Sequence, residues 1–586
     1  MDFNVIPVET DVLIIGGGLA GCMAAIKARE GDVSVTIAEK ANTIRSGCAG
    51  TGVDHTWGYC PPVHQKMGWT IEDLMEDHDQ KHARGLLDKS LLYLVASTMY
   101  DRLQDMEKFG INFRYDDSKA PGKFRLVYQF HSQPTSYNFD GRDMKVKLTQ
   151  EARRRGVDIV NRVMVTDLLT ADGHVSGAVG VSTRDKNIYL FKAKAVILST
   201  GRVHRLSRNQ SGIMFNLRSH PLSGDGKAMA LRAGLDLINM EFLTPERFQV
   251  GFYQTAGGAP GSSYQPGFRL IDQQGKVLMP RIQFYDWENL GKEKVNAAEA
   301  RKNWLEDGVR NRPPTLEEWR QGGGPYYLDG SQATEEEVQY AEWALSHEGK
   351  CWQFLRHLEE EGVDLRKDML EFALHDRENA GTAAAGVVVG KDLETGIKGL
   401  YAAGDEVGGL PWSSCPGALT MGWYAGDMAA AQARSQTRFL PVTEEKVAAL
   451  RESCADIYHA GDGYHWKEVQ LALQTIMDYY CYNVRSAPML DRGLERLQEL
   501  RKAPLSATNP HELFRCLEMK SMIESAEMTM RASLCREESR RVPTFRRADF
   551  PEQDDKNWLA FAAVSHKDGR FSVARLPVEK EVWRPR

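Results

Sequence analysis

The sequence lacks the cysteine spacings that hold zinc, iron–sulfur clusters or a disulfide framework. Its nine cysteines are scattered over 586 residues, and none stands in a CxxC pair. An odd, scattered set indicates reduced thiols that mostly fill the core, as in proteins of a reducing compartment. We therefore predict no metal ligands in this chain. Any iron–sulfur centre that exchanges electrons with it is expected on another chain.

Long apolar runs and a strong charge excess are also missing. No window approaches the roughly 18–20 apolar residues that a membrane-spanning helix requires, and the first residues show no basic segment followed by an apolar one. The net charge is only −6 and no basic stripe occurs, which argues against nucleic acid as a partner. We expect a cytoplasmic protein that does not insert into a membrane and associates with one only through its partners.

The strongest motif lies near the start of the chain. Residues 11–15, Asp-Val-Leu-Ile-Ile, predict a short buried parallel strand, and GGGLAG follows directly. Gly16 permits a tight turn, Gly18 lets the backbone approach a pyrophosphate, and Gly21 lets the next helix pack on the strand. The N-terminus of that helix favours phosphate. The motif predicts a dinucleotide bound at Gly16, Gly18, Leu19, Ala20 and Gly21.

A second strand, residues 33–39, ends in Glu39, where the motif expects the acid that binds a ribose. The chain then enters a polar, glycine-rich loop, residues 40–52, instead of a further nicotinamide-type repeat. The N–H groups of such a loop are suited to follow a pyrophosphate toward a flavin ring, so FAD is the leading candidate. The predicted contacts of this part are Glu39, Lys40, Arg45, Ser46, Gly47, Gly50, Thr51 and Gly52.

Further cofactor contacts are predicted where later strands end and helices begin, because ligands of parallel sheets bind at those ends. A buried strand ends at residue 201, a turn opens a helix at 223–234, and a strand, Gly-Asp and helix follow between 399 and 433. The predicted contacts are Val165, Thr200, Gly201, Asp225, Gly404, Asp405, Ala418 and Leu419. For Asp225 the alternative is a simple helix N-cap.

The predicted fold is α/β, with a Rossmann-like FAD-binding domain, an inserted α+β capping domain and a C-terminal helical domain. The αβ alternation stops where Gly, Pro, Trp and Tyr become frequent, and it returns later. The predicted parts are 1–242 (FAD-binding, first part), 243–372 (capping and substrate), 373–440 (FAD-binding, second part), 441–540 (helical) and 541–586 (an irregular C-terminal tail).

Several segments resemble the flavoprotein subunits of the fumarate reductase and succinate dehydrogenase family. They are VLIIGGGLAG, SGDGKAMALRAGLDLINMEF, ETGIKGLYAAGDEVGG and the late pattern of ESR followed by DD and W. EKANTIRSG and PERF are similar to the adenylylsulfate reductase α-subunit branch. The resemblance implies an FAD-dependent oxidoreductase that exchanges electrons with a ferredoxin-like iron–sulfur subunit, with further electron-transfer subunits as additional candidate partners. It also implies non-covalent FAD, because Gly47 stands where the dicarboxylate enzymes have the histidine that attaches FAD.

The sequence departs from the family at its substrate residues. The substrate arginine of the dicarboxylate enzymes is absent from LPWSSCPGALTMG, and their proton-donating arginine falls near Tyr264. Gly381 occupies the place of a branch histidine, and His375 lies six residues upstream. We therefore expect a substrate other than a C4 dicarboxylate.

Arg247, His131 and His375 are the candidate catalytic residues, with Arg247 as the cation that meets developing negative charge. For Arg247, and for His131 and Arg142, the alternative is a solvated surface position. Three other functions stay open: a flavin electron-transfer module, relaying or bifurcating, without its own substrate; an adenylylsulfate reductase α-like enzyme; and a stand-alone flavin oxidase similar to L-aspartate oxidase.

Overall fold

The computed structural model describes residues 3–53, 55–114, 122–127, 131, 133–208, 221–243, 247–250, 268–279, 319–346, 352–375, 384–540, 545–567, 569–579 and 581–583. It describes the backbone alone at 247–250, 319–320, 340, 344–345, 352–354 and 372–375.

A seven-stranded sheet forms the centre, in the order β6-β2-β1-β9-β8-β7 with β17 beside β9. Its strands are β1 (Asn4–Ile15), β2 (Val35–Glu39), β6 (Asp158–Asn161), β7 (Val163–Ala171), β8 (His174–Ser182), β9 (Asn187–Leu198) and β17 (Leu400–Ala402). β1, β2, β6, β9 and β17 pair in parallel, and β7 and β8 form an antiparallel hairpin. Val12 to Ile15 are at most 3% exposed, which explains their unbroken apolar run. The predicted α/β fold is confirmed.

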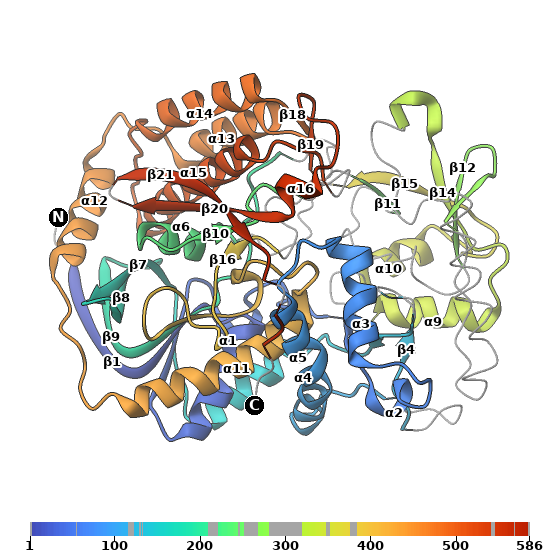
Figure 1. The fold of residues 1–586 in the computed structure, drawn as a ribbon, viewed down its shortest axis with the longest axis horizontal. Coiled ribbons are helices and arrows are strands. Elements are labelled where there is room, and N and C mark those ends of the chain that lie inside the picture. The colour runs from blue at the N-terminus through green and yellow to red at the C-terminus, as the bar shows by residue number, and fades with distance from the viewer. Residues whose placement is uncertain are drawn as a thin grey trace.

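Helices α1 (Leu19–Ala28) and α11 (Ser414–Ser435) lie side by side against this sheet (Figure 1). Their backbones touch, because a Cβ atom on Gly422 would lie 2.4 Å from the carbonyl oxygen of Ala20. A Cβ atom on Gly426 would lie equally close, at 2.4 Å, to the carbonyl oxygen of Ala24. Glycine at these two positions therefore sets how closely the two helices can approach.

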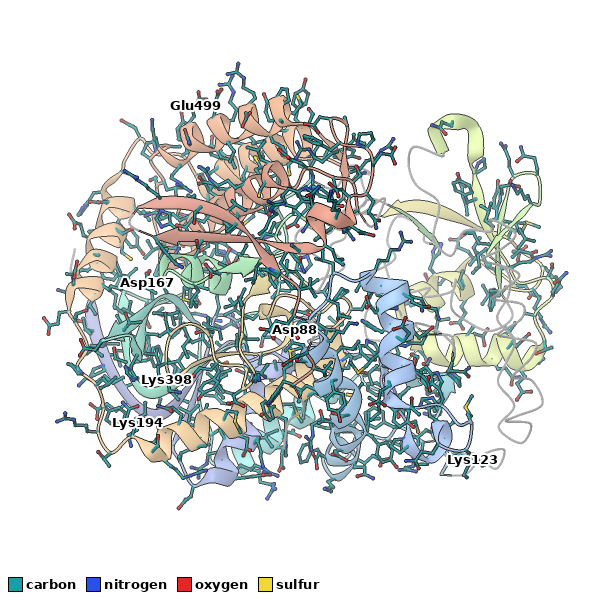
Figure 2. All side chains as sticks on the ribbon, viewed as in Figure 1. Asp88, Lys123, Asp167, Lys194, Lys398 and Glu499 are labelled. Atoms are coloured by element: carbon teal, nitrogen blue, oxygen red, sulfur yellow. The ribbon has the colours of Figure 1, made fainter. Side chains whose placement is uncertain are left out.

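The rest of the FAD-binding part surrounds this core. It consists of the 3₁₀ helices η1 (Arg29–Gly31), η2 (Thr43–Arg45) and η7 (Gly404–Glu406), β3 (His55–Trp57), α2 (Pro61–His64), α3 (Ile71–His78), the π-helix η3 (Asp79–Ala83), α4 (Lys89–Lys108), β4 (Leu126–Val127), β5 (Ser136–Asn138), α5 (Met144–Arg154) and α6 (Asp225–Arg232). Asp88, labelled in Figure 2, caps α4 by accepting hydrogen bonds from the N–H groups of Ser90 and Leu91.

A separate lobe at the right of Figure 1 matches the predicted α+β insertion. Its antiparallel sheet has the order β11-β15-β14-β12-β13. The elements are β11 (Arg247–Val250), β12 (Arg269–Asp272), β13 (Val277–Met279), the π-helical turn η6 (Trp319–Gly323), β14 (Tyr326–Asp329), α9 (Glu335–Ser346), α10 (Trp352–Glu360) and β15 (Leu370–His375). The domain boundaries themselves stay predictions.

The C-terminal third begins with helices α12 (Glu445–His459), α13 (Trp466–Tyr480), α14 (Ala487–Arg501) and α15 (Pro510–Cys535). α15 is buried on nearly every side, so it is the central helix of this part. The short strands β18 (Val484–Arg485) and β19 (Arg546–Arg547) pair beside it, and α16 (Asp555–Trp558) follows. The predicted C-terminal helical domain is confirmed.

The prediction of an irregular tail is wrong. β20 (Ala560–Lys567) and β21 (Arg570–Pro577) form a hairpin, and β20 adds to β10 (Leu237–Ile238) and β16 (Gly386–Val387) in a four-stranded sheet. The chain end is held because buried Arg536 donates hydrogen bonds to the carbonyls of Trp558 (3.1 Å) and Ala560 (2.8 Å), and buried Arg540 donates to the carboxylate of Asp555 (2.6 Å). The tail therefore closes onto the body as ordered sheet.

Candidate functional site

The glycine-rich turn between β1 and α1 has one open side. Gly16 has φ +100°, and a Cβ atom there would lie 2.6 Å from the carbonyl oxygen of Ser199. A Cβ atom on Gly21 would lie 2.0 Å from the carbonyl oxygen of Gly16. At Gly18 nothing lies within 4 Å of that position. The turn is therefore closed toward the sheet and open where a pyrophosphate would approach.

Glu39 is fixed beside this turn. It is 7% exposed, and its carboxylate accepts hydrogen bonds from the N–H groups of Gly17 (2.7 Å) and Ala41 (2.6 Å). Each carboxylate oxygen retains a second lone pair. The side chain is thus held at the end of β2, where it can accept from a ribose hydroxyl.

Two helix N-termini meet at Gly404. A Cβ atom there would lie 3.0 Å from Cβ of Ala20 in α1 and 3.4 Å from Cα of Ala418 in α11. Leu419, the next residue, is fully buried. Helix N-termini carry unpaired N–H groups and partial positive charge. The fold therefore points two such ends at one place, which suits an anionic ligand.

The loop predicted to carry the flavin lies against the same turn. The hydroxyl of Ser46 donates to the carbonyl of Gly17 (3.2 Å), and a Cβ atom on Gly47 would lie 3.2 Å from Cα of Gly18. Gly50 is more crowded still, since its Cβ position is 1.9 Å from the carbonyl oxygen of Arg45. Gly52 is buried and Thr51 is exposed at the loop tip.

Arg45 lies on the outside of this loop. Its guanidinium donates to the carbonyl of Arg142 (2.7 Å) and pairs with Asp143 (3.3 Å), and 49% of its side chain is exposed. The bonds hold the loop to the start of α5. Val165, predicted in the same set, is buried in β7 at 4% exposure.

Lys40 and Asp225 lie in a buried ion cluster. The ammonium of Lys40 donates to Ser223 (2.6 Å), Asp225 (2.6 Å) and Glu518 of α15 (2.7 Å). The N-cap alternative for Asp225 is wrong, because Gly224 is the N-cap of α6. These two residues therefore join the FAD-binding part to the helical part.

Glu518 is the centre of this cluster and is fully buried. It also accepts hydrogen bonds from Arg205 (2.8 Å) and Arg515 (2.8 Å). Burial alone would raise the pKa of its carboxyl, but Lys40 and the two guanidinium groups outweigh burial, so its pKa lies well below the usual range. The carboxylate is charged in the folded protein and balances several buried cations.

Two buried cations beside the strand ends were missed by the sequence analysis. Lys227, fully buried in α6, donates to the carbonyls of Gly201 (2.8 Å) and Asp405 (3.0 Å). Arg202 donates to the carboxylate of Asp405 (2.7 Å) and to the hydroxyl of Ser414 (2.8 Å). A lysine inside the apolar run of α6 was the one signal that indicated such a role.

Thr200 is bonded to the same region. Its N–H donates to the buried carboxylate of Glu406 (3.2 Å). The strands β9 and β17 are parallel neighbours, so they end on the same side of the sheet. Thr200 and Gly201 therefore lie close to Gly404 and Asp405, although about 200 residues separate the two pairs in the sequence.

The loop before α11 has strained backbone. Trp412 in this loop has φ +57°, and Ser414, the first residue of α11, has φ +37°; residues other than glycine seldom adopt positive φ, and bulky ones such as tryptophan least of all. The indole of Trp57 donates to the carbonyl of Trp412 (2.9 Å), and Ser413 donates to Asp405 (3.1 Å). Strain held by its surroundings is common at ligand sites.

The candidate catalytic residues lie in two places. His131 is fully buried, 3.0 Å from a ring nitrogen of His78, so the surface interpretation of His131 is wrong. Arg142 is on the surface, with 51% of its side chain exposed. Arg247 and His375 are direct partners across the antiparallel pair β11 and β15. The fold therefore brings together two candidates that are 128 residues apart in sequence.

Comparison with protein families decides the assignment. Residues 11–417 match the FAD binding domain model, and residues 470–586 match the fumarate reductase flavoprotein C-terminal model. The chain belongs to the fumarate reductase/succinate dehydrogenase flavoprotein family.

The similarity to known proteins extends over almost the full chain. One subunit of the fumarate reductase (CoM/CoB) of Methanothermobacter marburgensis is 28% identical, and the match covers 93% of this chain and 95% of that protein. The succinate dehydrogenase flavoprotein subunit of Rickettsia bellii is 24% identical, and the match covers 95% of this chain and 93% of that protein. The structure of adenylylsulfate reductase from Archaeoglobus fulgidus superposes with a TM-score of 0.81 at 23% identity. The match covers 100% of this chain and 98% of that chain. That last likeness shows a shared fold.

As a member of this flavoprotein family, the chain is an FAD-dependent oxidoreductase. The geometry fits the family's cofactor: Gly18 has an open side, two helix N-termini lie close together, and the Glu39 carboxylate is held at the end of β2, which are features that an FAD site requires. Among the described helices, none combines the length and the apolar composition needed to cross a lipid bilayer.

Proposed function

We propose that this chain is the FAD-carrying subunit of a multi-subunit oxidoreductase. It exchanges electrons between non-covalent FAD and an iron–sulfur subunit, and it acts on a substrate other than a C4 dicarboxylate. The observation that carries the substrate proposal is the loop before α11. Arg202 beside it is bonded to Asp405, so this cation is already neutralised, and the loop itself contributes Trp412 instead of an arginine.

The need for a partner follows from the cysteines. None of the eight cysteines in the described part of the chain is in a disulfide, and five of them are buried. No group of them stands close enough to hold a cluster among the described residues. Relatives with this fold are named as subunits. In this proposal the flavin therefore passes single electrons to a carrier on another chain.

Bound FAD supplies two-electron chemistry at the site. In this proposal the turn at Gly18 binds its pyrophosphate and Glu39 its ribose. The N-terminus of α11 stabilises negative charge that develops nearby. Arg247 binds the anionic part of the substrate from the inserted lobe, with His375 opposite it across the strand pair as the proton donor.

Purification from the native source tests the assembly. We expect the chain to co-elute with an iron–sulfur subunit, and we expect fumarate to leave the absorption of the anaerobically reduced flavin unchanged, because no free arginine lies in the loop before α11. Succinate should likewise fail to reduce the oxidised flavin. A chain that elutes alone and releases peroxide during rapid turnover with oxygen would instead be an oxidase, and reoxidation by fumarate would contradict the substrate proposal.

Arg247→Met tests the substrate cation. With the substrate that oxidises or reduces the flavin of the parent complex, we expect kcat/KM to fall by about 10²–10³, the usual effect of removing one group that stabilises developing charge. FAD content should stay unchanged. Arg366→Met is the matched control, because Arg366 lies on the same lobe with 44% of its side chain exposed. Equal activity of the two variants would show that Arg247 does not take part in the reaction. A flavin that no small molecule reduces or oxidises in the intact complex would favour an electron-transfer module.

A further inference from the structure

A histidine cluster lies beside the loop that precedes α11. It consists of His78, His82 and His131, each of which offers one ring nitrogen, and these nitrogens all lie within 4.8 Å of one another. His78 and His131 are fully buried and His82 is partly exposed. We propose that this histidine cluster binds a divalent transition metal ion, zinc in the first instance.

The local fold presents the first two ligands together. His78 ends α3 and His82 lies in the π-helix η3, four residues later. Residues four apart share one face of a helix. The widened turn is visible in the hydrogen bond from the N–H of Arg84 to the carbonyl of Asp79 (2.6 Å). π-Helical turns are rare and frequently occur at functional sites.

The third ligand arrives from a distant part of the chain. His131 lies between β4 and β5, and its ring contacts Trp57 at a centroid distance of 5.2 Å. The ring of Trp57 also lies against His78, at 4.9 Å. Packing against the indole limits rotation of both imidazoles. The two rings are thus held toward each other before any ion binds.

The outer ring nitrogens of His78 and His131 both have hydrogen-bond partners. Nε2 of His78 is 2.9 Å from the carbonyl oxygen of Pro411, and a carbonyl only accepts, so Nε2 carries the proton and Nδ1, which lies 3.0 Å from His131, offers its lone pair to the cluster. Nδ1 of His131 is 2.7 Å from the hydroxyl of Thr135, which leaves Nε2 toward the cluster. Such hydrogen bonds fix the tautomer and orientation of metal ligands.

The spacing of the two inner nitrogens is close to that of a zinc site. Nδ1 of His78 and Nε2 of His131 are 3.0 Å apart. Two nitrogens bound tetrahedrally to zinc at about 2.0–2.1 Å are roughly 3.3–3.4 Å from each other. An opening of a few tenths of an ångström therefore accommodates an ion between these two rings, and His82 completes three ligands.

A metal-free interpretation of the same pair exists and makes a different prediction. Nε2–H of His131 can donate to Nδ1 of His78, which forms a hydrogen-bonded pair of neutral rings. That pair needs only His78 and His131. A metal ion also needs His82, so substitution of His82 separates the two interpretations.

The surrounding charge does not oppose a cation. Lys81, next to His82 in sequence, is paired with Asp77 at 2.6 Å, and Lys89 lies 3.8 Å from Asp79. The partly exposed His82 gives an ion a route from solvent. Three neutral imidazoles suit zinc, and ions such as cobalt(II), iron(II), nickel(II) or copper(II), better than magnesium or calcium. Three protein ligands also leave a fourth position for water or a substrate oxygen.

The test begins with the FAD-loaded parent protein. Elemental analysis of the purified protein is expected to find about one zinc per chain. After dialysis against a chelator, calorimetric titration with Zn²⁺ should restore one ion per chain, and Co²⁺ should produce the absorption bands of a low-coordinate cobalt site. A parent protein that binds neither ion stoichiometrically would overturn the proposal, and this result needs no variant.

His82→Gln is the decisive variant, because its side chain is partly exposed and its loss disturbs packing least. We expect Zn²⁺ affinity to fall by at least about 100-fold, since removal of a ligand costs more than removal of an outer hydrogen-bond partner. His64→Asn is the matched control: His64 is buried and bonded to the backbone of Cys60 (2.9 Å) and Pro134 (3.1 Å), outside the cluster. FAD content and melting temperature verify folding. Equal Zn²⁺ affinity in His82→Gln and the parent would identify an adventitious ion and overturn the proposal.

Discussion

Gly18→Ala is expected to fold like the parent protein and to lose most of its FAD. The backbone at Gly18 has φ −66°, which alanine adopts readily, and within the described part of the chain nothing lies within 4 Å of the added Cβ atom. The new methyl group therefore clashes only with a bound pyrophosphate, which must approach the backbone at this position. We expect the affinity for FAD to fall by about 100-fold, or roughly 2.7 kcal/mol.

Flavin absorbance of the purified protein and titration of the apoprotein with FAD measure this effect. Gly461→Ala is the matched control, because its Cβ position is also open and it has no positive φ. The control should retain full FAD content. If Gly18→Ala retained stoichiometric FAD with unchanged affinity, the pyrophosphate would have to lie elsewhere, and the assignment of this turn as the binding site would be wrong.

Glu518→Gln is expected to be the most destabilising single substitution considered for this chain. The carboxylate is the common partner of Lys40, Arg205 and Arg515 at 2.7–2.8 Å, and it is fully buried. Removing one partner of a buried ion pair leaves uncompensated charge and costs about 3–5 kcal/mol. Because the cluster joins α15 to the FAD-binding part, the loss should lower the first thermal transition and loosen the helical part.

Differential scanning calorimetry and hydrogen exchange of α15 measure the change. Glu499→Gln is the control: Glu499, labelled in Figure 2, is on the surface of α14 with 63% of its side chain exposed, and its pair with Arg496 contributes less than about 1 kcal/mol. Equal melting temperatures of the two variants would show that the cluster does not hold the parts together.

The same carboxylate has a predictable pH dependence. The folded pKa of Glu518 lies well below the value of about 4.3 in the unfolded chain. Its stabilisation is therefore fully present above about pH 4.3 and is lost as the pH falls further toward the folded pKa. The difference in melting temperature between the parent protein and Glu518→Gln should therefore become smaller as the pH is lowered below about 4.3.

The sequence by itself determined the α/β class, the predicted FAD-binding turn, and the order of strand, glycine turn and helix that forms it. Residues 11–21 form one local unit, in which an apolar strand, three glycines and a helix have positions fixed by neighbouring residues. Glu39 follows at a fixed spacing, and its place beside Gly17 was predictable for that reason. The alternation on either side of Gly569 also carried a hairpin signal, so the ordered tail was open to prediction from the sequence.

Tertiary structure alone decided which charged and titratable groups meet. Lys40 reaches Glu518 across 478 residues, His78 reaches His131 across 53, and Arg247 pairs with His375 through strand register. The sequence marked several of these residues as candidate site residues, but it did not indicate which distant residue each of them would meet. Whether a lysine or histidine is buried depends on which distant element covers it, and neither periodicity nor spacing within a segment contains that information. Contacts between segments far apart in the chain are set by packing of the whole domain, and so the ion cluster and the histidine cluster became visible only in three dimensions.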